Sequence, residues 1–164
     1  MSDYSDNLKK LVISFHDNFK EIEDLLASKH PAPGKWSSKE ILGHLIDSAA
    51  NNHRRFVQAA YQDDFVFDGY DQDKWVAVQR YNEVPWIFLL DLWKSYNLHL
   101  ARIMEVIPQQ TKIKERHPHN LNKIAWKTVP ADEPATLEYF MIDYIGHLQN
   151  HLKQIEAILE KDKA

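Results

Sequence analysis

The sequence has 164 residues, of which 44% are hydrophobic and 12% aromatic, enough for one globular domain with a sizeable core. A net charge of −4 gives no electrostatic reason to expect a nucleic-acid partner, and only four glycines argue against a glycine-rich phosphate loop. The absence of cysteine excludes disulfides, thiolate metal ligands and a cysteine nucleophile. With no apolar run of roughly 18 residues and no signal pattern, we expect no membrane association and a cytoplasmic single domain over 1–164.

The first half of the chain predicts two helices. Apolar residues at three- and four-residue steps predict the first over about 5–28, and the proline-rich segment 31–34 ends it. Ser37 followed by Glu40 is a capping box, which predicts the start of a second helix that runs to about Tyr61.

One face of this second predicted helix is polar and lies beside its apolar face. A polar stripe of this kind is usually solvated, but it can also line a cleft between helices, and this helix alone does not decide between the two. His53 lies about 180° from His44 around the helix, so these two histidines cannot share a site. The stripe consists of Glu40, His44, Ser48, Asn51 and Arg55.

The second half predicts two further helices between long connections. The acidic, aromatic segment 62–84 lacks the ligand spacing of an EF-hand, and we expect it to be irregular and to pack over a bundle end, where it could help close a pocket. Helices are predicted from Pro85 to Pro108 and from about 134–136 to 160. The basic connection 109–133 carries His117 and His119, which we expect on the loop surface.

Four helices of roughly 22 to 27 residues predict an all-α fold, since each would be about 35 Å long at 1.5 Å per residue. This length is typical of a four-helix bundle. The two long connections allow crossover topology instead of a simple up-and-down arrangement.

His147 and His151 stand four residues apart in the last predicted helix, so both imidazoles can point at one spot. The pair is either a metal half-site or two ordinary hydrogen-bonded histidines. If the second and fourth helices are neighbours, His44 can join the pair. Three nitrogen ligands would leave open positions on a divalent metal, with zinc, nickel, iron or manganese all compatible and calcium and magnesium disfavoured.

Three segments resemble a known family. The segment 35–45 (KWSSKEILGHL) looks like the N-terminal motif of the DinB/YfiT-like metalloenzymes, and 146–155 (GHLQNHLKQI) looks like their C-terminal H-x-x-x-H motif. The segment 69–76 (GYDQDKWV) is similar to the middle of one DinB-like branch. The resemblance spans about residues 5 to 160 and implies a four-helix bundle with a divalent metal held by His44, His147 and His151.

The resemblance also implies candidate activities. The family includes thiol-dependent S-transferases and isomerases that use a low-molecular-weight thiol, and members labelled hydrolases; many of them are dimers. We therefore expect a metal that activates water or a thiol for attack on a small-molecule substrate, in a homodimer. Because the chain has no cysteine, a thiol nucleophile would have to arrive as a cosubstrate.

Six further residues are candidates around the metal. Asp143, one turn before His147, could orient that ligand. The alternatives to an enzyme are a module that binds a metal or small ligand without turnover, and a dimerising bundle in which the histidines only clamp two helices. The predicted catalytic residues are Asp47, Asn51, Tyr81 and Asp143, and the predicted substrate-binding residues are Arg55 and Asp71.

Overall fold

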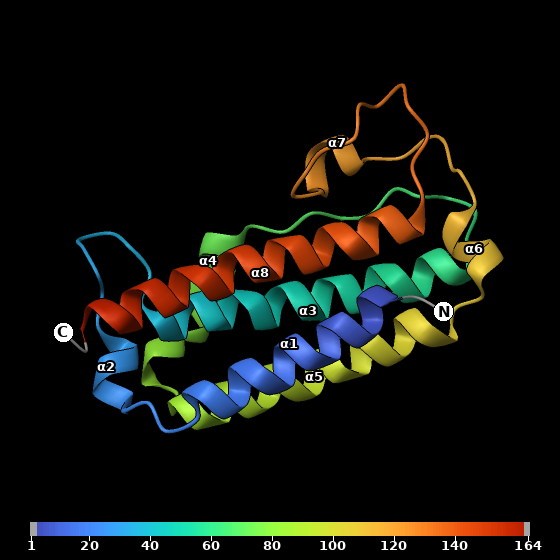
Figure 1. Ribbon diagram of the computed structural model, residues 1–164. Helices are drawn as coiled ribbons and strands as arrows, with labels where there is room; N and C mark the ends of the chain where they lie inside the picture. Colours follow the sequence, from blue (N-terminus) through green and yellow to red (C-terminus); the bar gives the residue numbers. More distant parts are fainter. Residues whose placement is uncertain (1–2, 163–164) are drawn as a thin grey trace.

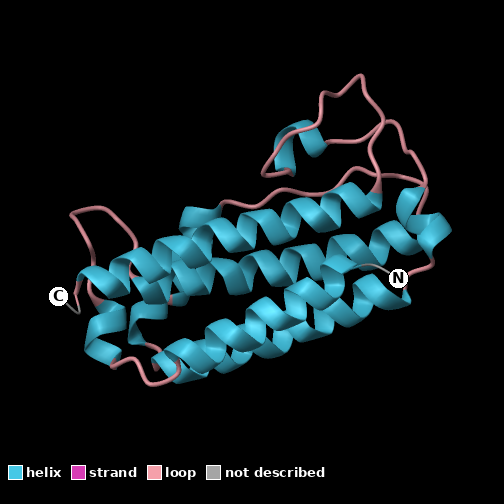
Figure 2. Cartoon of the chain, viewed as in Figure 1, coloured by secondary structure: helices cyan, strands magenta, loops and turns pink. Residues whose placement is uncertain are grey.

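Four long helices form the body of the computed structural model, which describes residues 3–162 (Figure 1). Within these residues there is no strand, only two isolated bridges, which confirms the predicted all-α bundle (Figure 2). The long helices are α1 (Asp3–Phe19), α3 (Ser38–Tyr61), α5 (Trp86–Val106) and α8 (Leu137–Lys161). The short ones are α2 (Asp24–Ser28), α4 (Gln72–Gln79), the 3₁₀ helix η1 (Tyr81–Glu83), α6 (Gln109–Ile113) and α7 (Leu121–Ile124).

The order of the helices in space differs from their order in the chain. α1 packs against α5, α5 against α3, and α3 against α8. The colours of Figure 1 show that α3 and α5 run in one direction and that α1 and α8 run in the other. The connection from α3 to α5 therefore runs back along the length of the bundle, whereas the connection from α5 to α8 joins two neighbouring ends. One of the two long connections is thus a crossover.

The first predicted helix is broken, so its expected span of 5–28 is wrong. α1 ends at Phe19, whose carbonyl oxygen accepts a hydrogen bond from the indole Nε1 of Trp86 at 2.8 Å. The carboxylate of Asp24 accepts the backbone N–H of Trp86 at 2.7 Å and the buried ammonium of Lys39 at 2.9 Å. These contacts come from residues distant in sequence, and helical periodicity carries no information about them.

The predicted helix boundaries elsewhere agree with the structure. The Ser37 side chain accepts the backbone N–H of Glu40, and the Glu40 carboxylate accepts the N–H of Ser37, which completes the capping box. Thr136 caps α8 by accepting the N–H of Tyr139, and Pro85 directly precedes α5. Local side-chain chemistry therefore determines where three of the four long helices begin.

The crossover segment 62–84 is more regular than predicted, since it contains α4 and η1, and it runs along the side of the bundle instead of over its end (Figure 1). Phe65 and Phe67 bury their rings in the core. In the second connection, His117 is exposed as predicted, but His119 is only 6% exposed and contacts the carbonyl of Glu133 at 2.7 Å. The expectation that His119 lies on the loop surface is therefore wrong.

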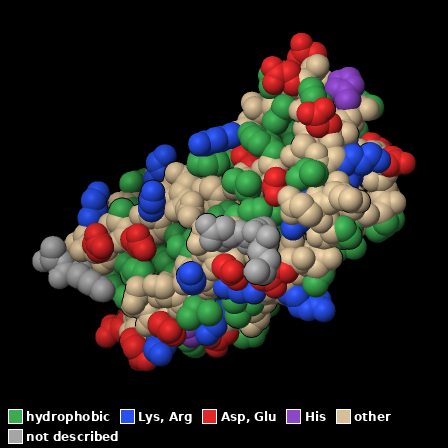
Figure 3. Space-filling model, turned by 45° about the vertical axis from the view of Figure 1, so that its right-hand side comes forward, with side chains coloured by type: hydrophobic (Ala, Val, Ile, Leu, Met, Phe, Trp, Pro, Cys, Tyr) green, Lys and Arg blue, Asp and Glu red, His purple; other side chains and the backbone are tan. Residues whose placement is uncertain are grey.

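The largest apolar side chains fill the interior, whereas most charged side chains lie on the surface. The fully buried aromatic residues include Trp86, Trp93, Phe56 and Phe65. Acidic and basic side chains both occur across the face drawn in Figure 3, and those described there form no continuous basic patch. Within residues 3–162, every helix is too short or too polar to traverse a lipid bilayer.

Gly43 on α3 tests the contact between the crossover and the bundle. A Cβ at position 43 would lie 2.1 Å from the Tyr81 ring, so we predict that Gly43→Ala destabilises the protein by about 1–3 kcal/mol in chemical denaturation. Gly69→Ala is the matched control, because its Cβ would meet its nearest neighbour only at 4.0 Å, and it should change stability by less than about 0.5 kcal/mol. Equal stability of the two variants would contradict the packing described here.

Candidate metal centre

Three imidazoles meet between α3 and α8. The Nε2 atoms of His44 and His147 are 3.3 Å apart, and those of His147 and His151 are 3.1 Å apart. All three ligand atoms lie within 4.8 Å of one another. His44 is only 1% exposed, and the other two are half-buried. The early histidine and the late pair therefore converge as the sequence suggested, while metal binding itself stays a prediction.

The spacing of these nitrogens fits a shared metal ion. Ligands about 2.0–2.1 Å from a tetrahedral metal lie about 3.3 Å from each other, close to the two shorter separations. The Nδ1 of His151 lies 2.9 Å from the amide oxygen of Gln154, which can only accept, so this contact favours the proton on Nδ1 and leaves the Nε2 lone pair directed at the cluster. The second ring nitrogen thus orients this ligand.

Burial keeps the cluster uncharged. Loss of solvent lowers the pKa of His44 to about 3, with repulsion from His151 and His147 as smaller causes. Burial likewise lowers the pKa of His147 to about 4, and it lowers the pKa of His151. A histidine must be deprotonated to bind a metal through its lone pair. These imidazoles are already neutral at neutral pH, so metal binding need not displace a proton from them.

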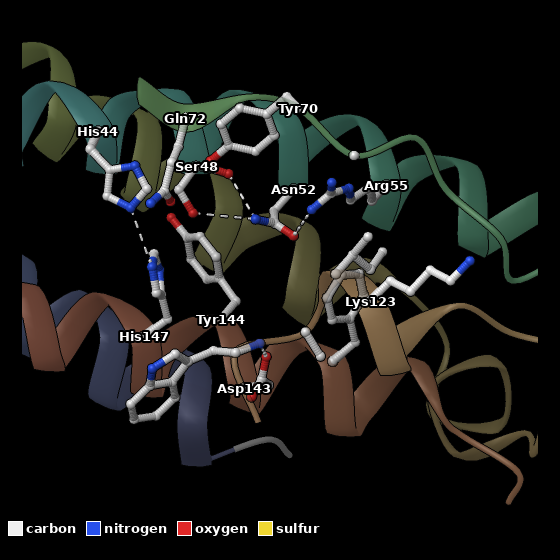
Figure 4. Close-up of a pocket in the computed structure, with 15 residues that line it drawn as sticks. His44, Ser48, Asn52, Arg55, Tyr70, Gln72, Lys123, Asp143, Tyr144 and His147 are labelled. Atoms are coloured by element: carbon white, nitrogen blue, oxygen red, sulfur yellow. Dashed lines mark hydrogen bonds between the residues drawn. The ribbon is translucent and has the colours of Figure 1, made fainter. Parts of the chain in front are cut away.

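A cavity of about 380 Å³ opens beside His44 and His147 (Figure 4). Successive turns of α3 form one wall, and α8 forms the opposite wall. The connection before α4 and the segment around α7 close the remaining sides. The residues that line the cavity include His44, Ser48, Asn52, Arg55, Tyr70, Lys123, Trp126, Phe140, Asp143, Tyr144 and His147.

The sequence that builds this bundle and its histidine cluster matches a known family. The family model described as the DinB superfamily matches residues 14–155. The chain belongs to the DinB superfamily. A search of curated protein sequences finds no match.

Among solved structures, the DinB chain is similar to YfiT from Bacillus subtilis, which is described as a probable metal-dependent hydrolase with an unusual four-helix bundle topology. The TM-score is 0.75 at 17% sequence identity, and the match covers 99% of this chain and 90% of YfiT. At this identity the likeness establishes the shared fold.

Two of the predicted catalytic residues of this DinB protein, Asp47 and Tyr81, lie outside the cavity lining. The buried Asp47 carboxylate accepts hydrogen bonds from the Tyr81 hydroxyl at 2.6 Å and from the Gln79 amide at 2.8 Å. Its second oxygen is buried without a partner among the described residues. Burial raises the pKa of both Asp47 and Tyr81. The pair joins the crossover to α3 one turn after His44, and its catalytic role stays a prediction.

Asp143 does line the cavity, but its two oxygens are directed at the loop before α8. They accept the backbone N–H groups of Trp126 and Lys127, each at 2.8 Å. The Trp126 ring in turn lies 6.5 Å from that of His147, centroid to centroid. The carboxylate therefore holds in place the loop that walls the histidine cluster, and the predicted orientation of His147 by Asp143 stays untested.

The other three predicted residues differ in their positions. Arg55 is buried and lines the cavity. Asn51 donates to the carbonyl of Asp47 on its own helix, and the exposed Asp71 caps α4 by accepting the N–H of Lys74. Neither Asn51 nor Asp71 is among the residues that line the cavity, and the roles predicted for them stay predictions.

Sequence reasoning missed several lining residues. Asn52 could have been found, because it lies one helical turn after Ser48, which itself lies one turn after His44. Tyr70, Trp126 and the others come from connections, whose positions over the cavity depend on the folded bundle. Helical spacing therefore identifies one wall of the cavity only.

We predict that the protein binds one divalent metal ion per chain at the histidine cluster. His44→Ala should lower the affinity for Zn²⁺ at least about a hundredfold in a competition titration, because one of three protein ligands is lost. His53→Ala is the matched control on the same helix, since the His53 ring packs instead against Tyr96 and His99. Equal Zn²⁺ affinity of His44→Ala and the wild type would refute the site.

Metal-free protein should lose stability as the pH falls below 6.5. The pKa of His44 and His147 is lower in the folded chain than the ordinary 6.5, so the unfolded chain binds more protons between about pH 4 and 6.5. The free energy of unfolding therefore rises with pH across this window and levels off above it. Urea denaturation with a chelator, at pH 5 and 7.5, should show a smaller pH effect for a His44→Gln/His147→Gln variant. An unchanged pH effect would contradict the assignment.

Proposed function

We propose that the protein is a metal-dependent enzyme of the hydrolase or thiol-dependent transferase type. His44, His147 and His151 would hold one divalent ion, such as zinc, nickel, iron or manganese. When bound, such an ion lowers the pKa of a coordinated water or thiol and so supplies a nucleophile near neutral pH. The observation that carries the proposal is the convergence of three neutral imidazole nitrogens at the wall of a cavity large enough for a small substrate.

The protein's own residues would position the substrate and exclude water. Aromatic rings surround the cavity, and Ser48 and Asn52 offer polar groups along α3. Asp143 is the only carboxylate among the described lining residues, and both of its oxygens already accept backbone N–H groups. The cavity thus presents no unoccupied carboxylate to act as a general base, which favours activation of the nucleophile at the histidine cluster.

The two rival functions differ in what they expect beside the metal. A purely structural clamp has no need for a cavity next to the histidines, so the cavity argues against it. A binding module without turnover would use the same geometry and differs only in forming no product. The description of YfiT as a probable metal-dependent hydrolase supports the enzymatic alternative.

Turnover on a panel of activated esters and soluble electrophiles, each with and without added L-cysteine, tests the proposal. Zn²⁺-, Ni²⁺-, Mn²⁺- or Fe²⁺-loaded protein should form product, and chelation or His44→Ala should lower the rate at least about a hundredfold. His53→Ala should retain the wild-type rate. Product without thiol identifies a hydrolase, and product only with thiol identifies a transferase. Tight binding of panel compounds without any metal-dependent product would favour the binding module instead.

A further inference from the structure

Arg55 is a buried cation that lacks an acidic partner. It is 6% exposed and forms no ion pair with any residue of the described range 3–162. Its Nη2 donates to the backbone carbonyl of Asp68 at 2.7 Å, and its Nη1 lies 3.5 Å from the amide oxygen of Asn52. Both partners are neutral. A buried charge is normally paired, because its desolvation is otherwise costly.

The guanidinium belongs to the wall of the cavity. Arg55 lies three turns of α3 beyond His44, and a long helical side chain leans back toward the helix N-terminus. The contact with Asn52 places its charged group about one turn nearer to the histidines than its own Cα. In Figure 4, Arg55 and Lys123 lie at one end of the cavity, and His44 and His147 lie at the other.

The other groups around the cavity do not neutralise Arg55. Tyr70 is the nearest acidic hydroxyl, with its ring centroid 6.0 Å from the guanidinium carbon, but burial raises the pKa of Tyr70 to about 12, so it is uncharged. Asp143 on the opposite wall is directed at the loop. Lys123, exposed on α7, adds a second positive charge. The Asp68 carboxylate is near enough to interact electrostatically with Arg55, but it is exposed, pairs with Arg54 and does not line the cavity. Among the described lining residues, this end therefore carries positive charge and no unoccupied anion.

We propose that this end is a carboxylate subsite: Arg55 binds the carboxylate of a small organic acid whose other end reaches the histidine cluster. That the other end of the acid reaches the histidine cluster rests on the proposed function. A planar guanidinium can donate two parallel hydrogen bonds to a carboxylate, and one buried positive charge matches one negative charge. The aromatic walls of Tyr70, Phe140 and Tyr144 suit an apolar or aromatic body between the two ends.

A purely structural role for Arg55 would have a different signature. Its bond to Asp68 ties the crossover to α3, so loss of the side chain could loosen the cavity as a whole. Such loosening would weaken acids and their neutral analogues alike. Selectivity for the charged member of a matched pair is therefore the property that identifies the subsite.

Calorimetric titration of the wild-type protein with 3-phenylpropionate, 3-phenylpropionamide and phenyl phosphate tests the subsite directly. Metal-free protein, prepared with a chelator that is then removed by dialysis, prevents the acid from binding to a metal instead. We expect 3-phenylpropionate to bind at least about tenfold more tightly than its amide, as a charge-assisted hydrogen bond predicts. Equal binding of the acid and the amide, or tighter binding of phenyl phosphate, would overturn the carboxylate assignment.

Two substitutions at position 55 and one neighbouring control locate the effect. Arg55→Met should reduce the preference for the acid to near unity, and Arg55→Lys, which keeps the charge but not the planar fork, should retain part of it. Arg54→Met is the control, because the exposed Arg54 pairs with the Asp68 carboxylate outside the cavity, and it should keep the full preference. An unchanged preference in Arg55→Met would overturn the proposal. If Arg55→Met fails to fold, the proposal is still tested by the preference of Arg55→Lys and by the comparison of acid and amide in the wild-type protein.

This test is separate from that of the proposed function. If the protein neither binds metal nor turns over substrate, the preference of the metal-free protein for the acid, and its dependence on Arg55, still test the subsite. If the protein is an active metalloenzyme but shows no such selectivity, only the subsite is lost.

Discussion

The packing of α3 against α8 is the constraint on which the site depends. α3 contacts α5 on one side, α8 on another and the crossover on a third, so its polar stripe lies inside the protein. A buried stripe must find partners or face a cavity, because unpaired polar groups in the interior are costly. His44 meets the α8 histidines, while Ser48 and Arg55 face the cavity. The same burial that makes the helix part of the core therefore also creates the candidate site.

The crossover segment makes this arrangement possible. By returning along the bundle it allows α3 and α5 to be parallel neighbours, and on its way it closes one side of the cavity with Tyr70. Its contacts with α3 include the Tyr81 ring against Gly43, the Tyr81 hydroxyl on the Asp47 carboxylate, and the Arg55 guanidinium on the Asp68 carbonyl. The bundle topology and one wall of the cavity thus depend on the same segment.

Electrostatics divides the cavity into two ends with different properties. At one end, burial holds the histidines neutral and suited to bind a cation. At the other end, Arg55 forms no ion pair with a described residue and suits an anion. Burial has opposite consequences because imidazole can lose its proton near neutral pH, whereas a guanidinium cannot. A substrate spanning the cavity would be oriented by this difference.

Elements with local causes could be predicted from the amino-acid sequence. Apolar periodicity and capping side chains predicted α3, α5 and α8, and the four-residue spacing of His147 and His151 predicted that they share a face. The resemblance of two short motifs added His44 to the pair. These features depend on neighbours within one or two helical turns, which the sequence displays directly.

Features that depend on contacts between distant residues became visible in the folded protein. Trp86 and Asp24 interrupt the first helix, the helix order makes one long connection a crossover, and His119 becomes buried. In the folded protein the Asp143 carboxylate also accepts hydrogen bonds from the Trp126 loop, and Arg55 lines the cavity without an ion-pair partner among the described residues. Periodicity can place a side chain on a face of its helix, but which chain segment meets that face depends on how the whole bundle packs.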